Sequence, residues 1–307
     1  MAKSYTVSSR LLAHYRRTAR DLPWRRTHDP YAVLVSEVML QQTQAARVTP
    51  AFDRFVRRFP TLEALAAAPL GAVLREWSGL GYNRRARDLH RIARMSPQGL
   101  PKTVAELDAL PGIGAYTAGA IASFAFGLRV PFADTNIERV LGRVFLGRPG
   151  TNKEAIELDA SAMPKRSSDL WHHALMDLGA TICKPKPQCE ICPLSSDCRY
   201  ARGPAGTAAS LLRGAAGGSL RRGARQREAK GTAAGRYQDR PLRPAAYRDT
   251  DRRIRGAIVK ALVGSERGMT VRALEKDIGD PRVGRLVSAL TADGLVESAG
   301  RRVRLPL

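Results

Sequence analysis

Apolar residues recur at helical spacing from residue 1 to about residue 202, with polar residues at the positions between them. Runs such as LHRIARM (89–95) and IERVLGRVFL (137–146) have one apolar and one polar face. Proline and glycine interrupt the pattern at short intervals, and no segment alternates as strands do. The pattern predicts an all-α bundle of short helices for this part of the chain.

The pattern stops at residues 203–250, which consist mostly of Ala, Gly and Arg. Ten Lys and Arg stand there against three Asp and Glu. A segment with so few large apolar side chains cannot offset the entropy lost on ordering, so it is predicted to be a basic disordered linker. A non-specific DNA tether and a plain linker both fit this composition.

Helical spacing returns from residue 251. Its apolar positions predict three helices, and LVESAGRRVRL (295–305) predicts two short strands around Ala299 and Gly300. Three helices followed by a hairpin resemble a winged helix, which we predict for residues 251–307. Such modules bind DNA or contact other proteins, and the pattern leaves both open.

The net charge of the chain indicates what kind of partner it binds. The chain of 307 residues carries 51 Lys and Arg against 28 Asp and Glu, a formal net charge of +23. Hydrophobic residues make up 44%, enough for a real core, and the length suggests about two domains. An excess of this size favours a polyanionic partner such as nucleic acid, with a merely soluble cationic surface as the alternative.

The four cysteines indicate a metal site, because the cellular location that the sequence suggests disfavours disulfides. The most apolar stretch, residues 115–128, is too short for a membrane span, and no secretory signal is visible at the N-terminus. We therefore expect a cytoplasmic protein, nucleoid-associated if bacterial. Disulfides are disfavoured there, and the spacing Cys183-x5-Cys189-x2-Cys192-x5-Cys198 can wrap one metal centre. Zinc and [4Fe–4S] both suit four thiolates, and spacing does not choose between them.

A glycine turn indicates how DNA is held. The motif LPGIG predicts a tight turn between two helices that exposes backbone N–H groups at a helix N-terminus. Such a helix-hairpin-helix element binds DNA phosphate without reading bases. Its residues are Leu110, Pro111, Gly112, Ile113 and Gly114.

Glu37 is the first candidate for chemistry, because it lies in the otherwise apolar run AVLVSEVML. Desolvation raises the pKa of a carboxyl group, and a Glu that titrates near neutrality suits general acid catalysis. The alternative is a buried Glu that an arginine neutralises. Candidates for that partner are Arg20, Arg25 and Arg26.

Asp134 is the second candidate, just before a helix that begins at Asn136 or Ile137. Asp is a preferred N-cap, so capping and catalysis both fit this position. Two further motifs, QQTQ (41–44) and GLGYN (79–83), place Gln and Tyr at turns. These side chains either push into a base stack or mark ordinary polar helix ends.

Several motifs together resemble a known family over roughly residues 8 to 200. In chain order they are LPWRR, DPYAVLVSEVMLQQTQ, GLGYNRRARDLH, LPGIGAYTAGAI, DTNIERVLGR, ALMDLGATIC and the cysteine cluster. They look like the catalytic half of the adenine DNA glycosylases, the MutY family of the helix-hairpin-helix superfamily. The resemblance implies a six-helix barrel at residues 30–143 and an iron–sulfur cluster domain from residues 1–29 and 144–202.

The resemblance also implies an activity: a monofunctional hydrolase that removes adenine paired with guanine or 8-oxoguanine in base excision repair. Tyr116 stands where bifunctional lyases carry a lysine, so no Schiff base is expected. The implied partner is double-stranded DNA with such a mismatch, and we expect a monomer.

The resemblance further implies residue roles. Glu37, protonated, would donate to adenine N7, and Asp134 would stabilise the sugar cation, with Asn136 and Tyr116 orienting them. The other matching positions are Arg20, Trp24, Arg25 and Asp177 around adenine, Gln42 and Tyr82 wedged into the base stack, and Cys183, Cys189, Cys192 and Cys198 on a [4Fe–4S] cluster.

Three features depart from the family. Its first cysteine spacing is usually x6 and here is x5, and His172 and His173 replace amides. Residues 203–307 do not resemble the family's β-rich domain for oxidised guanine, so the opposite base must be recognised elsewhere or more weakly. A mismatch glycosylase for thymine opposite guanine and a non-catalytic DNA-binding protein are the alternatives.

Overall fold

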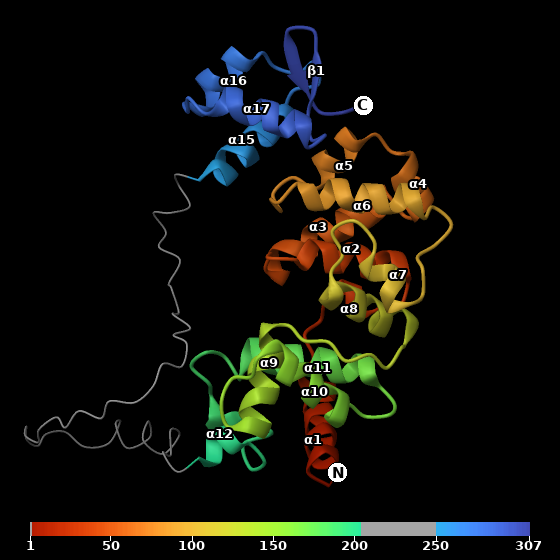
Figure 1. The fold of residues 1–307 in the computed structure, drawn as a ribbon, viewed down its shortest axis with the longest axis vertical. Coiled ribbons are helices and arrows are strands. Elements are labelled where there is room, and N and C mark those ends of the chain that lie inside the picture. The colour runs from red at the N-terminus through yellow and green to blue at the C-terminus, as the bar shows by residue number, and fades with distance from the viewer. Residues whose placement is uncertain (1, 204–249) are drawn as a thin grey trace, which may run out of the picture.

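The computed structural model of the chain describes residues 2–203 and 250–307. Short helices make up its first part, as the spacing of apolar residues predicts (Figure 1). The helices and the turns named with them are α1 (Ala2–Thr18), η1 (Pro23–Arg25), α2 (Pro30–Leu40), α3 (Ala45–Arg58), α4 (Leu62–Ala67), α5 (Leu70–Glu76), α6 (Arg84–Met95), α7 (Val104–Asp108), α8 (Ala115–Phe126), α9 (Thr135–Leu141), η2 (Gly142–Leu146), α10 (Asn152–Ala162), α11 (Ser168–Thr181), η3 (Cys189–Ile191) and α12 (Arg199–Arg202).

Helix α2 is the centre of one group of helices, α2 to α8 (Figure 1). Residues 31 to 39 are buried all around it, so the helix is enclosed by its neighbours α3, α6 and α8. Its N-terminus is fixed by Asp29, whose carboxylate accepts hydrogen bonds from the N–H groups of Tyr31 and Ala32, each at 3.2 Å. Burial on every side explains why this run shows no polar face in the sequence.

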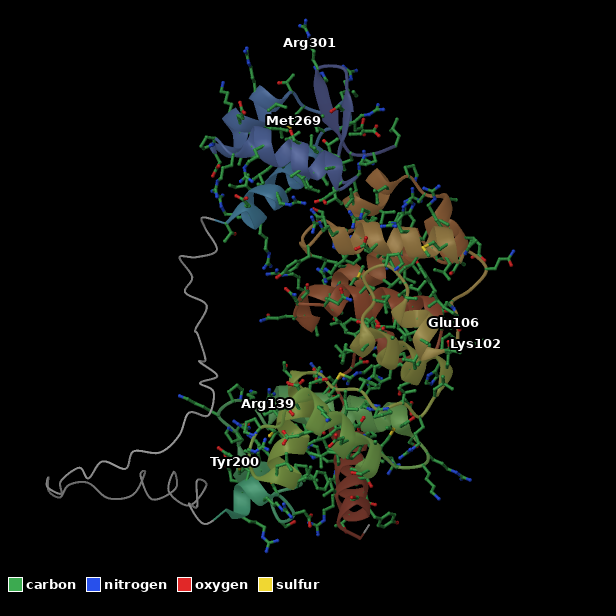
Figure 2. All side chains as sticks on the ribbon, viewed as in Figure 1. Lys102, Glu106, Arg139, Tyr200, Met269 and Arg301 are labelled. Atoms are coloured by element: carbon green, nitrogen blue, oxygen red, sulfur yellow. The ribbon has the colours of Figure 1, made fainter. Side chains whose placement is uncertain are left out.

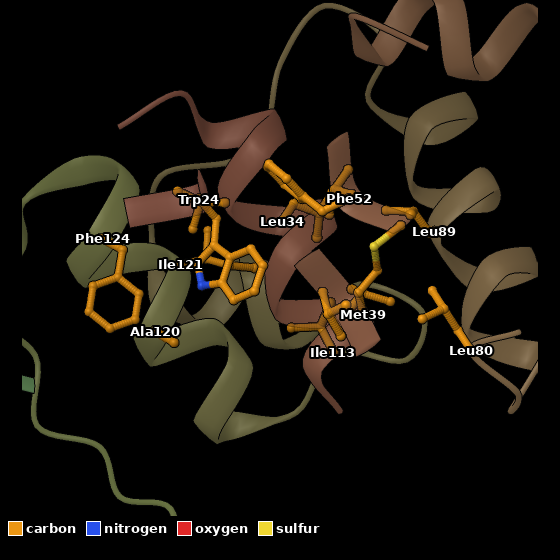
Figure 3. Packing of buried hydrophobic residues seen from close by; sticks show 14 of the residues in the cluster. Trp24, Leu34, Met39, Phe52, Leu80, Leu89, Ile113, Ala120, Ile121 and Phe124 are labelled. Atoms are coloured by element: carbon orange, nitrogen blue, oxygen red, sulfur yellow. The ribbon is translucent and has the colours of Figure 1, made fainter. Parts of the chain in front are cut away.

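The core around α2 is built from large side chains of several helices. Figure 3 shows Leu34 of α2 near Phe52 and Trp24, and Met39 of the same helix near Leu89 and Ile113. The rings of Trp24 and Phe52 meet edge to face at 5.6 Å between centroids. Leu34 and Met39 are fully buried, which anchors the helix that carries Glu37.

Helix α9 lies before the predicted domain boundary at residue 143 but packs on helices that follow it. It packs on α10 and α11, in the second group of helices with α1 and α12 (Figure 1). Its apolar residues Ile137, Val140 and Leu141 are buried there. Gly179 of α11 permits the approach, because a Cβ at that position would lie 2.6 Å from the Cβ of Asn136. Packing, and not chain order, thus decides which core this short helix joins, and the boundary at residue 143 stays a prediction.

The C-terminal module (residues 251–307) has the predicted order of elements. Helices α15 (Asp251–Val263), α16 (Val271–Ile278) and α17 (Val283–Ala292) precede the antiparallel pair β1 (Glu297–Ala299) and β2 (Arg302–Arg304). Val303 also bridges Met269, so the hairpin is tied to the chain before α16. The winged-helix interpretation of these elements stays a prediction.

The predicted disordered linker lies almost wholly outside the described residues, which omit 204–249. Within the described ranges 2–203 and 250–307, no helix is long and apolar enough to cross a membrane.

Candidate active site

A cleft between the two groups of helices brings most of the predicted site residues together. A smaller side chamber shares Glu37, Trp24, Arg25, Phe124 and His173 with it. The predicted residues that line the cleft are Arg20, Trp24, Arg25, Glu37, Gln42, Tyr116, Asp134 and Asn136.

Glu37 faces this cleft from the last turns of α2 and is only 7% exposed. Burial, together with the nearby charge of Asp134, raises the pKa of Glu37 to about 7, and the charge of Arg25 opposes the rise. No hydrogen bond or ion pair joins an arginine to this carboxyl group within residues 2–203 and 250–307. The structure thus does not support the alternative of a Glu neutralised by Arg20, Arg25 or Arg26.

The three arginines are engaged by other carboxylates. Arg25 donates from both terminal nitrogens to Asp177 at 2.8 Å, and Nε of Arg20 donates to Asp177 at 2.6 Å. Arg26 pairs with Asp21. Burial raises the pKa of Asp177, but the hydrogen bonds and charges of Arg25 and Arg20 outweigh it and leave the pKa below its usual value. Asp177 does not line the cleft, in contrast to the predicted pocket set, and instead holds two arginines that do.

Asp134 is the N-cap of α9. One carboxylate oxygen accepts hydrogen bonds from the N–H groups of Asn136 at 2.9 Å and Ile137 at 2.8 Å. The other oxygen accepts one from Nδ2 of Asn136 at 2.8 Å. The capping interpretation is confirmed, and the same contacts fix a carboxylate at the wall of the cleft.

Arg139 is a residue that sequence reasoning missed. It donates to Oδ1 of Asn136 at 2.7 Å, which sets the orientation of the amide toward Asp134. It also donates to the carbonyl oxygens of Gly179 at 2.9 Å and Cys183 at 2.6 Å. One side chain thus connects the Asp134 cap with the start of the cysteine segment. Only the position of Arg139 one turn after Asn136 hints at this.

Tyr116 lies near the N-terminus of α8, and its hydroxyl is 3.8 Å from Sδ of Met176. Burial, and then the charges of Glu37 and Asp134, raise the pKa of Tyr116 well above its ordinary value. Tyr116 therefore stays a neutral hydrogen-bond donor beside the two carboxyl groups.

The two histidines differ in their surroundings. His172 is fully buried, and its Nε2 lies 2.8 Å from a carboxylate oxygen of Asp159, whose other oxygen accepts a hydrogen bond from Nε1 of Trp171 at 2.6 Å. His172 is therefore part of a closed core network. His173 lines the cleft and stacks on Phe124 with 4.1 Å between ring centroids. Burial holds the pKa of His173 well below its ordinary value, so the ring is neutral.

Gln42 and Tyr82 share a strained backbone. Each has a positive φ, 53° and 47°, which costs energy for residues other than glycine. Gln42 is exposed at the rim of the cleft, and Tyr82 is half-buried in the turn before α6. Backbone of this kind persists only where the surroundings hold it, and it is concentrated at functional sites.

Arg85 fixes the backbone of both turns. The sequence analysis did not predict this role. Its Nη1 donates to the carbonyl oxygens of Val38, Met39 and Gln41 at 2.9, 2.8 and 2.6 Å. Its Nη2 donates to the carbonyl oxygens of Leu80 at 3.2 Å and Gly81 at 3.1 Å. Burial lowers the pKa of Arg85 to about 10, so the group remains charged at neutral pH. The sequence shows an arginine in the motif but not these distant acceptors.

The glycine turn at residues 110–114 joins α7 to α8, as predicted. Gly112 has a φ of +73°, and within the described part of the chain no side chain caps the N-terminus of α8. Leu110 and Ile113 are buried and anchor the turn, while Gly112 and Gly114 are exposed. Nε2 of Gln41 donates to the carbonyl oxygen of Gly112 at 3.2 Å, so the turn is tied to the end of α2. The exposed N–H groups of the turn suit an anion such as phosphate.

The four cysteines line one small cavity together with apolar side chains such as Val140 and Leu178. Among the described residues, no three thiols are gathered closely enough to form a single-ion site. Burial, with smaller effects from the other thiols, raises the pKa of Cys192 to about 11. Arg143 braces the segment by donating to Sγ of Cys183 at 3.4 Å and to the carbonyl oxygen of Lys184 at 2.6 Å. Four soft ligands around one cavity fit an iron–sulfur cluster.

Comparisons with known proteins agree with this architecture. The profile of the HhH-GPD superfamily base excision DNA repair proteins matches residues 35–165. The structure of a thermostable thymine-DNA glycosylase is similar with a TM-score of 0.61 at 31% identity, covering 66% of this chain and 97% of that one. An endonuclease III–DNA complex gives 0.56 at 25% identity, covering 67% and 95%. Fold and site thus define a helix-hairpin-helix protein of base excision repair.

Relatives in sequence show which family of base excision repair proteins this chain belongs to. An adenine DNA glycosylase of Mycolicibacterium smegmatis is 38% identical over 300 residues, covering 94% of this chain and 91% of that protein. The human adenine DNA glycosylase is 44% identical over 209 residues, covering 62% of this chain and 38% of that protein. The chain belongs to the adenine DNA glycosylase family.

Proposed function

We propose that the protein is an adenine DNA glycosylase of base excision repair that hydrolyses the N-glycosidic bond of adenine opposite guanine or 8-oxoguanine. The observation that carries this proposal is the Glu37 carboxyl group, whose pKa of about 7 lets it hold a proton at the wall of a cleft that Asp134 shares. Two carboxyl groups with different environments are the arrangement that glycosidic bond cleavage needs.

The reaction requires adenine outside the duplex, because the base is unreachable within the stack. The protonated Glu37 donates to adenine N7, and the bond between C1′ and N9 breaks as its electron pair leaves with the base. The sugar becomes an oxocarbenium-like cation that the Asp134 carboxylate stabilises, and water adds to C1′ with loss of a proton. The neutral hydroxyl of Tyr116 and the amide of Asn136 orient the two carboxyl groups.

Trp24, Arg25 and Arg20 form the pocket for the extruded base. Trp24 is held edge to face on Phe52, which gives a rigid aromatic wall. Asp177 acts through the arginines, because its carboxylate fixes both guanidinium groups at the cleft. Gln42 and Tyr82 act as wedges in the base stack, and residues 110–114 hold the phosphate backbone.

The cysteine cavity is proposed to hold a [4Fe–4S] cluster in preference to zinc. Cys183, Cys189, Cys192 and Cys198 would be its ligands, and when bound the cluster would fix the loop that Arg139 and Arg143 brace. Anaerobic purification with iron and sulfide analysis tests this assignment, and stoichiometric zinc would overturn it.

A thymine-specific activity is the second candidate, because a thymine-DNA glycosylase shares 31% identity over 66% of the chain. The two substrates differ in the atom that needs a proton. Thymine has no N7 for Glu37 to protonate, which favours adenine.

A panel of duplexes with every mismatch separates the candidates by the base released in single turnover. We expect adenine release opposite guanine and 8-oxoguanine, no release of thymine, and no borohydride-trapped adduct, because Tyr116 offers no amine. Glu37→Gln should lower the rate about 10²- to 10⁴-fold while duplex binding persists. Asp21→Asn removes an exposed carboxylate and should leave the rate unchanged. Turnover by Glu37→Gln at the wild-type rate would refute the assignment.

A further inference from the structure

The C-terminal module rests on the helices that flank the Tyr82 turn. The N–H of Gly71 in α5 donates to the carbonyl oxygen of Pro306 at 2.8 Å. A Cβ at Gly71 would lie 2.5 Å from that oxygen, so this position has room for no side chain. Leu305 is buried next to it. A glycine inside a helix is destabilising, and here it lets the end of the chain approach.

A second contact reaches the first turn of α6, directly after Tyr82. The carboxylate of Asp293, which follows α17, accepts hydrogen bonds from Nε and Nη2 of Arg84 at 3.1 and 2.9 Å. The carbonyl oxygen of Asp293 accepts one from Nη1 of Arg87 at 2.7 Å. Arg255 of α15 binds the same carboxylate. Asp293 therefore ties the module to the helix whose N-terminus carries the Tyr82 turn.

The third contact is with Tyr82 itself. The guanidinium carbon of Arg252, at the start of α15, lies 3.6 Å from the centroid of the Tyr82 ring. The guanidinium carbon of Arg85 lies 5.3 Å from the same centroid. A cation over an aromatic face is attracted to the ring, and a planar guanidinium also stacks on it. The ring of Tyr82 thus has one support from α6 and one from a segment 170 residues further along the chain.

We propose that Arg252 is a positioning residue for Tyr82, and that the C-terminal module thereby takes part in opening the DNA duplex. The contact holds the ring of a residue whose backbone is strained, so that it is already oriented when DNA arrives. This inference rests on the proposed role of Tyr82 as a wedge. The module makes no contact with adenine in this account and acts on the step before chemistry.

The test measures base extrusion by the fluorescence of 2-aminopurine placed at the target position, in rapid mixing with the full chain. Arg252→Ala should slow the rise in fluorescence about fivefold to tenfold, the scale of one cation–aromatic contact. Arg301→Ala is the matched control, because it removes one positive charge from the outer tip of the hairpin, on the side of the module away from α6 (Figures 1 and 2). It should leave the extrusion rate unchanged.

A double-mutant cycle shows whether Arg252 acts through Tyr82. Tyr82→Ala should slow extrusion, and adding Arg252→Ala to it should cause no further loss. Asp293→Ala, which frees the module by a different contact, should slow extrusion in the wild-type background and likewise add nothing to Tyr82→Ala. Thermal unfolding of each variant checks that the fold persists.

Additive effects of Arg252→Ala and Tyr82→Ala would overturn the proposal and indicate direct binding of Arg252 to DNA phosphate. Wild-type extrusion by Arg252→Ala, with a defect in Tyr82→Ala, would overturn it as well. Wild-type extrusion by Tyr82→Ala would instead refute the wedge role of Tyr82, and with it the basis of this inference.

Discussion

Two buried carboxyl groups, Glu37 on α2 and Asp177 on α11, are each 7% exposed and yet have pKa values shifted in opposite directions. Arg25 and Arg20 hydrogen-bond to Asp177, and these contacts stabilise its ionised form by more than burial destabilises it. Glu37 has Asp134 and apolar side chains around it instead, so its protonated form is favoured. Between two carboxyl groups that are equally exposed, the charged partner decides which is a fixed anion and which is an acid.

Arg25→Gln removes the difference between the two carboxyl groups, and of the variants considered it should lower the free energy of unfolding most. It removes two hydrogen bonds from the buried Asp177 carboxylate, and we expect the free energy of unfolding to fall by about 3 kcal/mol. Because the charge of Arg25 lowers the pKa of Glu37, that pKa should also rise. Urea unfolding at pH 7 measures the first effect. Arg26→Gln, in an exposed ion pair, is the control and should cost nothing measurable, and equal stability of both variants would contradict the comparison.

The two groups should also give opposite dependences of stability on pH. The pKa of Glu37 in the folded state, about 7, exceeds its ordinary value of 4.5, so its contribution to stability is complete below pH 4.5 and is lost as the pH rises to about 7. The loss should reach about 3 kcal/mol. For Asp177, whose pKa is lowered, stability is instead lost as the pH falls below 3.8.

Glu37→Gln isolates the first of these dependences. Urea unfolding between pH 4.5 and 7 should show a smaller decline for this variant than for the wild type. Parallel curves over this range would mean that Glu37 has an ordinary pKa.

The smallest effect concerns a third carboxylate, Asp29, which is exposed at the other end of α2. Asp29→Ala removes the N-cap and should cost about 1 kcal/mol of unfolding free energy. It should not change the dependence of stability on pH between 4.5 and 7, because the charge of Asp29 is not among those that shift the pKa of Glu37. Thermal unfolding across this range provides the measurement, and an altered slope would show that capping and titration of α2 are coupled.

The sequence predicted the elements that local patterns encode. The apolar run around Glu37 predicted the burial of this residue and its raised pKa. The cap by Asp134 and the three helices and hairpin of the C-terminal module were also predicted.

Contacts between distant segments were not predicted, because periodicity carries no information about them. Arg25 was a candidate partner for Glu37, but in the structure its guanidinium group hydrogen-bonds to Asp177. Arg85 and Arg139 bind carbonyl oxygens, and no residue type in the sequence marks a carbonyl acceptor. The contact between Pro306 and Gly71 joins positions more than 200 residues apart. The only sign of it in the sequence is the glycine at position 71, where a side chain would not fit.

The pH dependence of single-turnover adenine release tests the central claim most directly, that Glu37 holds its proton at neutral pH. The rate should fall about tenfold per pH unit above an apparent pKa near 7, because Glu37 loses the proton that it donates. A rate that already falls above pH 4.5, or one that stays constant to pH 9, would contradict the assignment of Glu37 as the acid.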